Sequence, residues 1–221
     1  SSHLALLMRT SMWLHAEIAE AITRGFQQEV DRLRLEQAIN GIDSIDNHDM
    51  VRLVASSAAT DGFGAWESVR FPRDDEHAGS SRPGRCDLVL TPDGLPLEQS
   101  RSEPTLFDPA EAVQPEAAFW LECVTIRQFK PEGPNHAYTR QFLKDTRGAI
   151  ERLACARRLV HKAVLIIVLG SDLSVLESDA GTWVKVMVDE GLPIGHPVTR
   201  AIEIPDSIGN TAALIMLAAV G

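Results

Sequence analysis

Two short apolar segments each carry one acidic residue, and these acids are the clearest candidates for chemistry in the chain. Asp87 lies in the segment 85–90 and Glu122 in the segment 119–126. Both segments read as β-strands because they are rich in β-branched, aromatic and other apolar residues. A carboxylate among such residues is costly to bury without compensation, and one shared divalent cation would compensate both acids. The sequence therefore predicts a metal-dependent hydrolase site.

The alternation of side chains along a strand predicts how this site would be built. If the two strands pair in a suitable register, Asp87 and Glu122 converge on one face, with Cys86 and Cys123 packed behind them. Two carboxylates and a backbone carbonyl form a partial shell for Mg²⁺ or Mn²⁺, which favour oxygen ligands and retain water. We therefore expect the two acids to be the metal ligands.

Hydrophobic periodicity predicts the elements that must position these acids. Apolar residues recur at three- and four-residue steps in four segments, which predicts helices at 11–39, 47–58, 136–159 and 173–190. Alternating or continuous apolar runs predict strands at 66–71, 85–90, 119–126, 163–169, 200–204 and 212–220. The alanines of the last run also allow a helix. This order of elements predicts an α/β sandwich with a mixed sheet.

The length of 221 residues and the 44% hydrophobic content suit a single α/β domain. We divide it into an N-terminal helical part (1–60), a core (61–170) and a C-terminal helix with strands (171–221). The segments 73–84 and 91–116 are rich in Gly, Ser or Pro and are expected to be loops or insertions. The sequence leaves open whether residues 1–7 are native.

In its order of elements and acids, the chain from about residue 17 to 169 resembles the PD-(D/E)XK nuclease superfamily. That resemblance implies the restriction-endonuclease-like fold, a three-layer sandwich with a central mixed β-sheet flanked by helices. It implies that Asp87 stands at the family's Asp position, that Glu122 is the acid of Glu-x-Lys, and that both bind Mg²⁺ or Mn²⁺. Glu29, on the first long helix, matches the family's additional helix acid, and Glu67 is a further acid at the edge of the site.

The chain departs from the family motif at Val124, which stands where the family has its Lys. Because that Lys polarises the attacking water, its loss either abolishes cleavage or transfers the role to another cation. Arg127 and Lys130, just beyond the strand, are the catalytic candidates. Arg140 and Lys144, on the following helix, are alternatives.

The charge of the chain limits how it can bind nucleic acid. A formal net charge of −10 argues against a protein that coats nucleic acid nonspecifically, because such binding needs many cations. The stretch 127–162 is the exception, with nine basic residues against three acidic ones. A local basic face is expected there, with Arg140, Lys144 and Arg147 as nucleic-acid contacts.

Several other classes of protein are disfavoured. The longest apolar runs reach about half of the roughly 20 residues that a membrane helix needs, so no membrane partner is expected. Three cysteines without a metal-type spacing fit a reducing cytoplasm. The seven histidines show no pairing typical of zinc ligands, and the motifs of serine hydrolases and P-loop NTPases are missing.

Three hypotheses remain. The first is a Mg²⁺-dependent nuclease that hydrolyses phosphodiester bonds of DNA. The second is a catalytically inactive nuclease-fold module that binds a protein, nucleic acid or a second copy of the chain, which Val124 and the charge of −10 favour. The third is an unrelated α/β protein in which both acids are structural.

Overall fold

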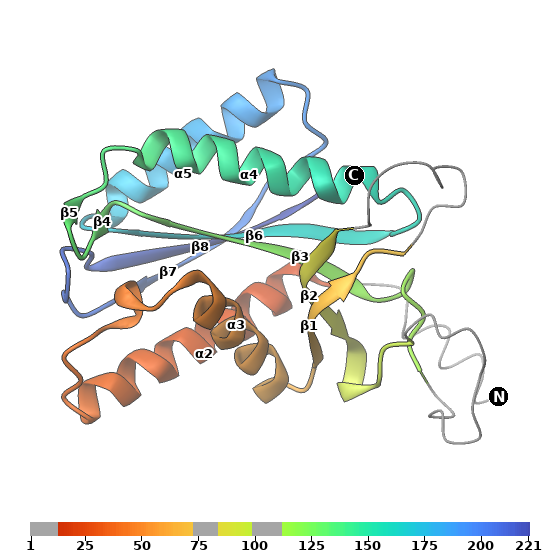
Figure 1. Cartoon of the computed structure of the whole chain (residues 1–221), viewed down its shortest axis with the longest axis horizontal. Helices are drawn as coiled ribbons and strands as arrows, with labels where there is room; N and C mark the ends of the chain where they lie inside the picture. Colours follow the sequence, from red (N-terminus) through yellow and green to blue (C-terminus); the bar gives the residue numbers. More distant parts are fainter. Residues whose placement is uncertain (1–12, 73–83, 99–111) are drawn as a thin grey trace.

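A six-stranded mixed sheet in the order β1-β2-β3-β6-β8-β7 forms the centre of the molecule (Figure 1). The structure is a computed structural model that describes residues 13–72, 84–98 and 112–221. The strands of the sheet are β1 (Gly64–Arg70), β2 (Arg85–Thr91), β3 (Phe119–Arg127), β6 (His161–Gly170), β8 (Ala212–Ala219) and β7 (Val198–Glu203). A separate hairpin consists of β4 (Phe129–Lys130) and β5 (Gly133–Pro134).

The two acid-bearing strands, β2 and β3, are neighbours in the sheet and lie second and third from the β1 edge. β1, β2 and β3 pair antiparallel, β3 and β6 pair parallel, and β8 pairs antiparallel with both β6 and β7. The parallel pair is joined through α4 (Tyr138–Cys155), as a parallel connection requires a crossover. β6 is buried along almost its whole length, which explains its continuous apolar sequence.

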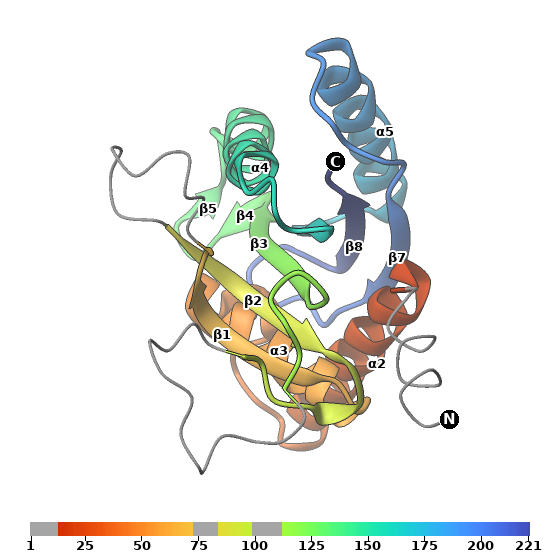
Figure 2. The ribbon, with the colours of Figure 1, turned by 90° about the vertical axis from the view of Figure 1, so that its right-hand side faces the viewer.

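Helices cover both faces of the sheet (Figures 1 and 2). On one face lie α2 (His15–Leu35) and α3 (Asn47–Thr60), and on the other lie α4 and α5 (Leu173–Asp189). α2 continues without a break through Gly25, where a side chain would collide with Ser57 of α3. This glycine therefore lets the two helices approach closely. The short 3-10 helices are η1 (Ile42–Ser44) and η3 (Pro92–Gly94).

Each face of the sheet has its own apolar core. Phe26, Val54, Leu121 and other buried residues form the α2–α3 side, whereas Trp120, Ile150, Trp183 and others form the α4–α5 side. These two cores confirm the predicted α/β architecture of a mixed sheet between helical layers.

The predicted elements agree with the structure apart from shifts at their ends. α3 begins at Asn47 because the Asp46 side chain accepts a hydrogen bond from Asp49 N at 2.8 Å. The alanine-rich residues 212–219 form a central strand, so the helical alternative for them is wrong. Residues 73–83 and 99–111, in the two expected loops, lie outside the described residues.

Candidate metal site

The register of β2 and β3 brings the two predicted acids to one position across the sheet. Leu88 pairs with Leu121 and Val89 with Trp120, and Asp87 and Glu122 are the next residues after the last of these pairs. Glu122 in turn pairs with Val164 of β6. The two acids thus come together where the pairing of β2 and β3 ends, and the charge of Asp87 contributes to a raised pKa of Glu122.

The sheet is irregular at this position. The paired residues of β2 and β3 end at Leu88, and beyond it Asp87 Oδ2 accepts a hydrogen bond from Cys123 N at 2.9 Å. On the neighbouring strand β1, Ser68 has a positive φ of 53°, which non-glycine residues adopt rarely. The side chain of Asp87 thus replaces a backbone partner where the strands separate.

This irregularity corrects the expected positions of the cysteines. Cys86 packs in the same core as Val89 and Trp120, although strict alternation would put Cys86 on the opposite face from Val89. Its thiol donates to Leu121 O at 3.3 Å. Cys123 packs on the α2–α3 side, so only one of the two cysteines lies behind the acids.

Glu122 and Asp43 are the buried acids in the described part of the chain, and Glu122 is the one with a carboxylate oxygen that lacks a donor. It is only 1% exposed, and its Oε2 accepts a hydrogen bond from Arg152 Nη2 at 2.6 Å. Its other oxygen, Oε1, is buried and receives no hydrogen bond from a protein donor within the described residues. Besides Arg152, the side chain that hydrogen-bonds Glu122 is Asp87, a second carboxyl, and this contact raises the pKa of Glu122. Burial raises the pKa of Glu122, the hydrogen bond from Arg152 lowers it, and the charge of Asp87 raises it again, with a net rise.

Arg152, on α4, is the cation that the structure places at the acids. Its side chain is 52% exposed, so it connects the buried carboxylate to the surface. The hydrogen bond to Glu122 raises the pKa of Arg152. The sequence contained a signal for this contact, because Arg152 follows buried Ala149 by three residues and so borders the apolar stripe of α4. Arg152 is not among the site residues that the sequence predicts.

Arg127 does not reach the acid pair. It lies five residues from Glu122 along β3, about 16 Å away at the usual rise of a strand, and an odd spacing points it to the other face. Its guanidinium donates to Asp43 O at 3.0 Å, to Asn47 Oδ1 at 3.0 Å and to Ile45 O at 2.5 Å. Arg127 therefore anchors the loop before α3, and burial lowers its pKa. Lys130 is still further along, in the β4–β5 hairpin.

The two additional acids predicted as ligands also lie apart from the pair. Glu29 is on α2, across the sheet from α4, and binds Arg32 at 2.6 Å. That hydrogen bond lowers the pKa of Glu29. Glu67 is exposed on the edge strand β1, where it pairs with Leu88 rather than with Asp87. The structure thus brings together two of the four predicted ligands.

Val124, at the position where the resembled family has its Lys, lies in an apolar environment. Val124 is 8% exposed and packs in the core on the α4–α5 side, two residues from Glu122 along β3. A side chain at this position shares the face of Glu122. Val124 therefore lies in the expected place, but it supplies no charge.

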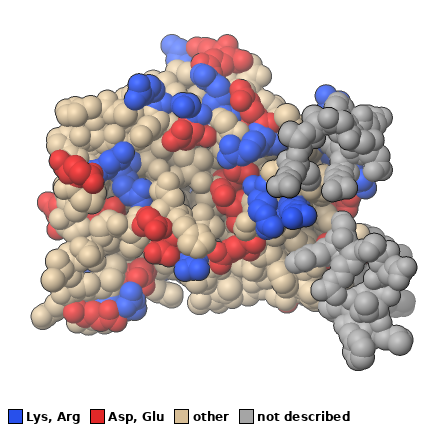
Figure 3. All heavy atoms as spheres, viewed as in Figure 1, with Lys and Arg blue, Asp and Glu red and all other residues tan. Residues whose placement is uncertain are grey.

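The predicted nucleic-acid contacts lie on α4 and differ in exposure and in ion pairing. Arg140 and Lys144 are exposed, whereas Arg147 donates to Glu190 through Nε at 2.9 Å and through Nη2. On the face seen in Figure 3, basic and acidic side chains are intermingled. That view shows no broad basic surface.

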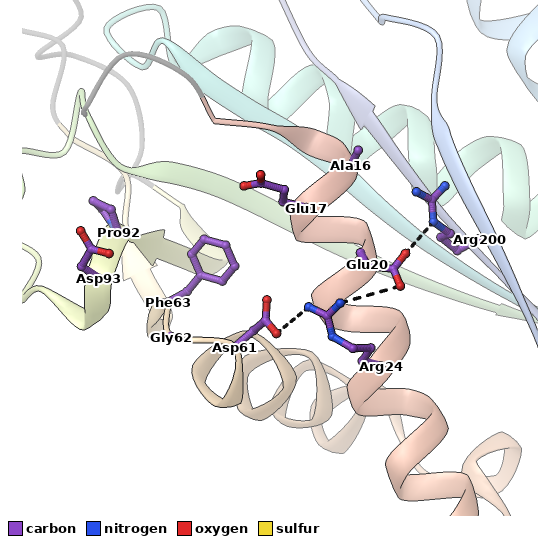
Figure 4. Close-up of a pocket in the computed structure, with 10 residues that line it drawn as sticks. All are labelled: Ala16, Glu17, Glu20, Arg24, Asp61, Gly62, Phe63, Pro92, Asp93 and Arg200. Carbon is purple, nitrogen blue, oxygen red and sulfur yellow. Dashed lines mark hydrogen bonds and ion pairs between the residues drawn. The ribbon is translucent and has the colours of Figure 1, made fainter. Parts of the chain in front are cut away.

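An open pocket of about 630 Å³ lies apart from the acid pair, between the start of α2, the end of α3, η3 and β7 (Figure 4). Arg24 binds Asp61 at 2.6 Å, and Arg200 binds Glu20 at 3.0 Å. Glu17 lines the same pocket without an ion-pair partner in the described part of the chain. None of the predicted site residues lines this pocket.

The donor set limits which ions the acid pair could hold. Among the described residues, no group of three or more His, Cys, Asp or Glu side chains is arranged to hold a metal ion. Mg²⁺ is commonly held by only one or two carboxylates together with water and substrate oxygens. The pair of Asp87 and Glu122 is therefore compatible with Mg²⁺ or Mn²⁺.

Comparison with known proteins gives no further guide to function. No family model, no curated protein and no solved structure is significantly similar to the chain. In the part of the chain that the structure describes, none of the helices has the length and apolar content needed to cross a bilayer.

Proposed function

We propose that the chain is a nuclease-like protein in which Asp87 and Glu122 hold Mg²⁺ or Mn²⁺ for the hydrolysis of phosphodiester bonds in DNA. The observation that carries this proposal is the buried Oε1 of Glu122, which receives no hydrogen bond from a protein donor among the described residues and belongs to an acid beside a second carboxylate.

A buried carboxylate oxygen without a partner is costly, and a second carboxylate nearby increases that cost. Arg152 compensates only the other oxygen of Glu122. A cation at Oε1 would offset the remaining charge, and oxygen ligands favour a hard divalent ion. Such an ion supplies Lewis acidity toward water and the phosphodiester when it is bound.

The topology supports the same proposal. Two helices, three antiparallel strands, a short hairpin, a crossover helix and a strand parallel to β3 follow one another, with Asp87 on β2 and Glu122 on β3. This is the order that the resemblance to the PD-(D/E)XK superfamily implies, and on that ground we propose a restriction-endonuclease-like fold. A cytoplasmic location fits the three cysteines, all of which are free.

A second candidate function is an inactive nuclease-fold module that binds a protein, a nucleic acid or a second copy of the chain. The specific observation in its favour is that Arg152 already occupies Glu122 Oε2 while Val124 fills the position of the motif Lys. In this case the ion pair would be a structural replacement for the metal site.

Calorimetric titration with Mg²⁺ and Mn²⁺, followed by a DNA cleavage assay, tests the proposal. We expect the wild type to bind Mn²⁺ and both Asp87→Asn and Glu122→Gln to bind it at least about tenfold more weakly, because each loses a charged ligand. Asn and Gln keep the oxygens that accept from Cys123 N and Arg152, so both variants should fold.

Glu17→Gln is the matched control, because it removes an unpaired carboxylate from the separate pocket. Its Mn²⁺ affinity should equal that of the wild type. Absence of Mn²⁺ binding by the wild type would refute the proposed site, and loss of binding only in Glu17→Gln would move the ion to the pocket. Binding at Asp87 and Glu122 without cleavage of DNA would select the inactive module.

A further inference from the structure

We propose that Arg152 is a phosphate-binding residue whose anion site is completed only when a divalent cation occupies Asp87 and Glu122. This inference rests on the proposed function and assigns to it a cation that the sequence motif lacks.

The charge at the site changes sign when a cation binds. Two carboxylates and one guanidinium leave the group of Asp87, Glu122 and Arg152 with one net negative charge, which repels a phosphate. A divalent cation turns this into one net positive charge, and in a partly buried site this difference is weakly screened. Cation binding should therefore precede or accompany anion binding.

Arg152 has the donors that such an anion needs. A guanidinium carries five N–H donors in a planar fork that matches two phosphate oxygens. Only Nη2 is hydrogen-bonded in the described part of the chain, to Glu122, and the side chain is 52% exposed. The other donors are thus available at the surface, beside the acid pair.

The hydrogen bond to Glu122 also holds the guanidinium in place. A buried carboxylate fixed in a β-strand is a rigid partner, so an anion that binds Arg152 would lose less side-chain entropy than at a free arginine. Arg152 is therefore preorganised next to the position that a cation at Oε1 would neutralise.

Other side chains around the acids do not replace Arg152. Val124 and Cys86 pack in the adjoining core and supply no cation. Arg147, one to two turns earlier on α4, is bound to Glu190. Among the described cations, Arg152 alone contacts Glu122, so it is the residue on which anion binding should depend.

The ligand class is a phosphate oxyanion, and in the proposed function its source is the DNA backbone. The experiment measures binding of inorganic phosphate and of a short single-stranded oligodeoxynucleotide by calorimetry, with and without saturating Mn²⁺. For the wild type we expect Mn²⁺ to raise affinity for both probes by about tenfold or more, a usual size for coupling between two sites. By reciprocity, phosphate should raise Mn²⁺ affinity by the same factor.

In Arg152→Gln this coupling should disappear, although Mn²⁺ itself should bind at least as tightly because a positive charge has been removed. Retained Mn²⁺ binding also shows that the variant is folded. If Arg152→Gln does not fold, Arg152→Lys decides, since it keeps a charge but loses the planar fork and should keep only part of the coupling. Arg157→Gln, an exposed cation beyond the end of α4, is the matched control and should behave as the wild type.

The outcomes separate the inference from the proposed function. If the wild type binds no Mn²⁺, the proposed function fails. If it binds Mn²⁺ but phosphate affinity is the same with and without the ion, or is unchanged in both Arg152 variants, the metal site stands and the role of Arg152 is refuted. Coupling seen with phosphate but not with the oligonucleotide would assign the anion site to a small phosphate instead of DNA.

Discussion

Glu122 and Arg152 form one ion pair but differ greatly in exposure, and this difference sets what each contributes to stability. The carboxylate is 1% exposed and the guanidinium side chain 52% exposed. Removing Arg152 leaves a buried charge without compensation, whereas removing the charge of Glu122 leaves a guanidinium that water can solvate. The two halves of the pair should therefore respond unequally to substitution.

We expect Arg152→Ala to lower the free energy of unfolding at neutral pH by about 3 kcal/mol, and Glu122→Gln to change it by less than about 1 kcal/mol. Urea denaturation followed by circular dichroism measures both. Arg157→Ala is the control and should lie within about 0.5 kcal/mol of the wild type. Equal losses in the two ion-pair variants would contradict a buried, charged Glu122.

The raised pKa of Glu122 predicts how stability depends on pH. Because the folded protein holds this proton more tightly than the unfolded chain, with its usual value of 4.5, the contribution of Glu122 is fully present below that value. It is lost as pH rises through the folded pKa. Glu122→Gln mimics the protonated acid and should not show this loss.

The unfolding free energy of Glu122→Gln relative to the wild type should therefore grow as pH rises above 4.5, the usual value for a glutamate. Urea titrations of both proteins at several pH values measure this difference. A difference that stays constant would show that Glu122 has the same pKa in the folded and unfolded states.

The contrast between Arg127 and Arg152 shows what the sequence could and could not provide at this scale. Asp87 and Glu122 were identifiable because an acid within an apolar strand is rare and costly. Arg127 is only five residues from Glu122 in the sequence. An odd spacing along a strand nevertheless places the two side chains on opposite faces. Arg152 is 30 residues from Glu122, and only the packing of α4 on β3 brings it there.

A buried hydrogen bond joins α4 to α5. Trp183 Nε1 donates to Thr146 Oγ1 at 2.8 Å, and both side chains are almost completely buried. α4 also carries Arg152. This contact therefore helps to hold in place the helix whose arginine binds Glu122.

Thr146→Val keeps the shape of the side chain but leaves the indole N–H of Trp183 without its acceptor. We expect a loss of about 1 to 3 kcal/mol in unfolding free energy, measured by urea denaturation with tryptophan fluorescence. Thr182→Val, an exposed threonine on α5, is the matched control and should change stability by less than about 0.5 kcal/mol. Similar losses in both variants would attribute the effect to helix propensity and not to the buried contact.

The existence and order of the elements were predictable because helices and strands repeat their apolar residues with different periods. The irregular position at Ser68 and Asp87 was not predictable, because neither strand has a glycine or proline at that position. It follows from the way β2 and β3 separate, and it decides which backbone group Asp87 binds.

For the whole molecule, the sheet extends beyond residues 61–170, because β8 and β7 from the C-terminal part continue it past β6. The chain as a whole carries a net charge of −10, yet the site is proposed to bind a polyanion. Arg147 is neutralised by Glu190, and the face in Figure 3 mixes both signs of charge. DNA binding at this site should therefore involve few phosphates.

Salt dependence measures that number directly, since each neutralised phosphate of B-DNA contributes about −0.9 to the slope of log K against log salt. With Arg140, Lys144 and Arg152 as the exposed cations along α4, we expect a slope near −3 for a duplex in Mn²⁺. Fluorescence anisotropy with a hydrolysis-resistant phosphorothioate duplex provides the measurement. The double variant Arg140→Gln, Lys144→Gln should reduce the slope by about 2. A slope that is unchanged in the double variant would place the DNA on another surface, whatever the state of the acid pair.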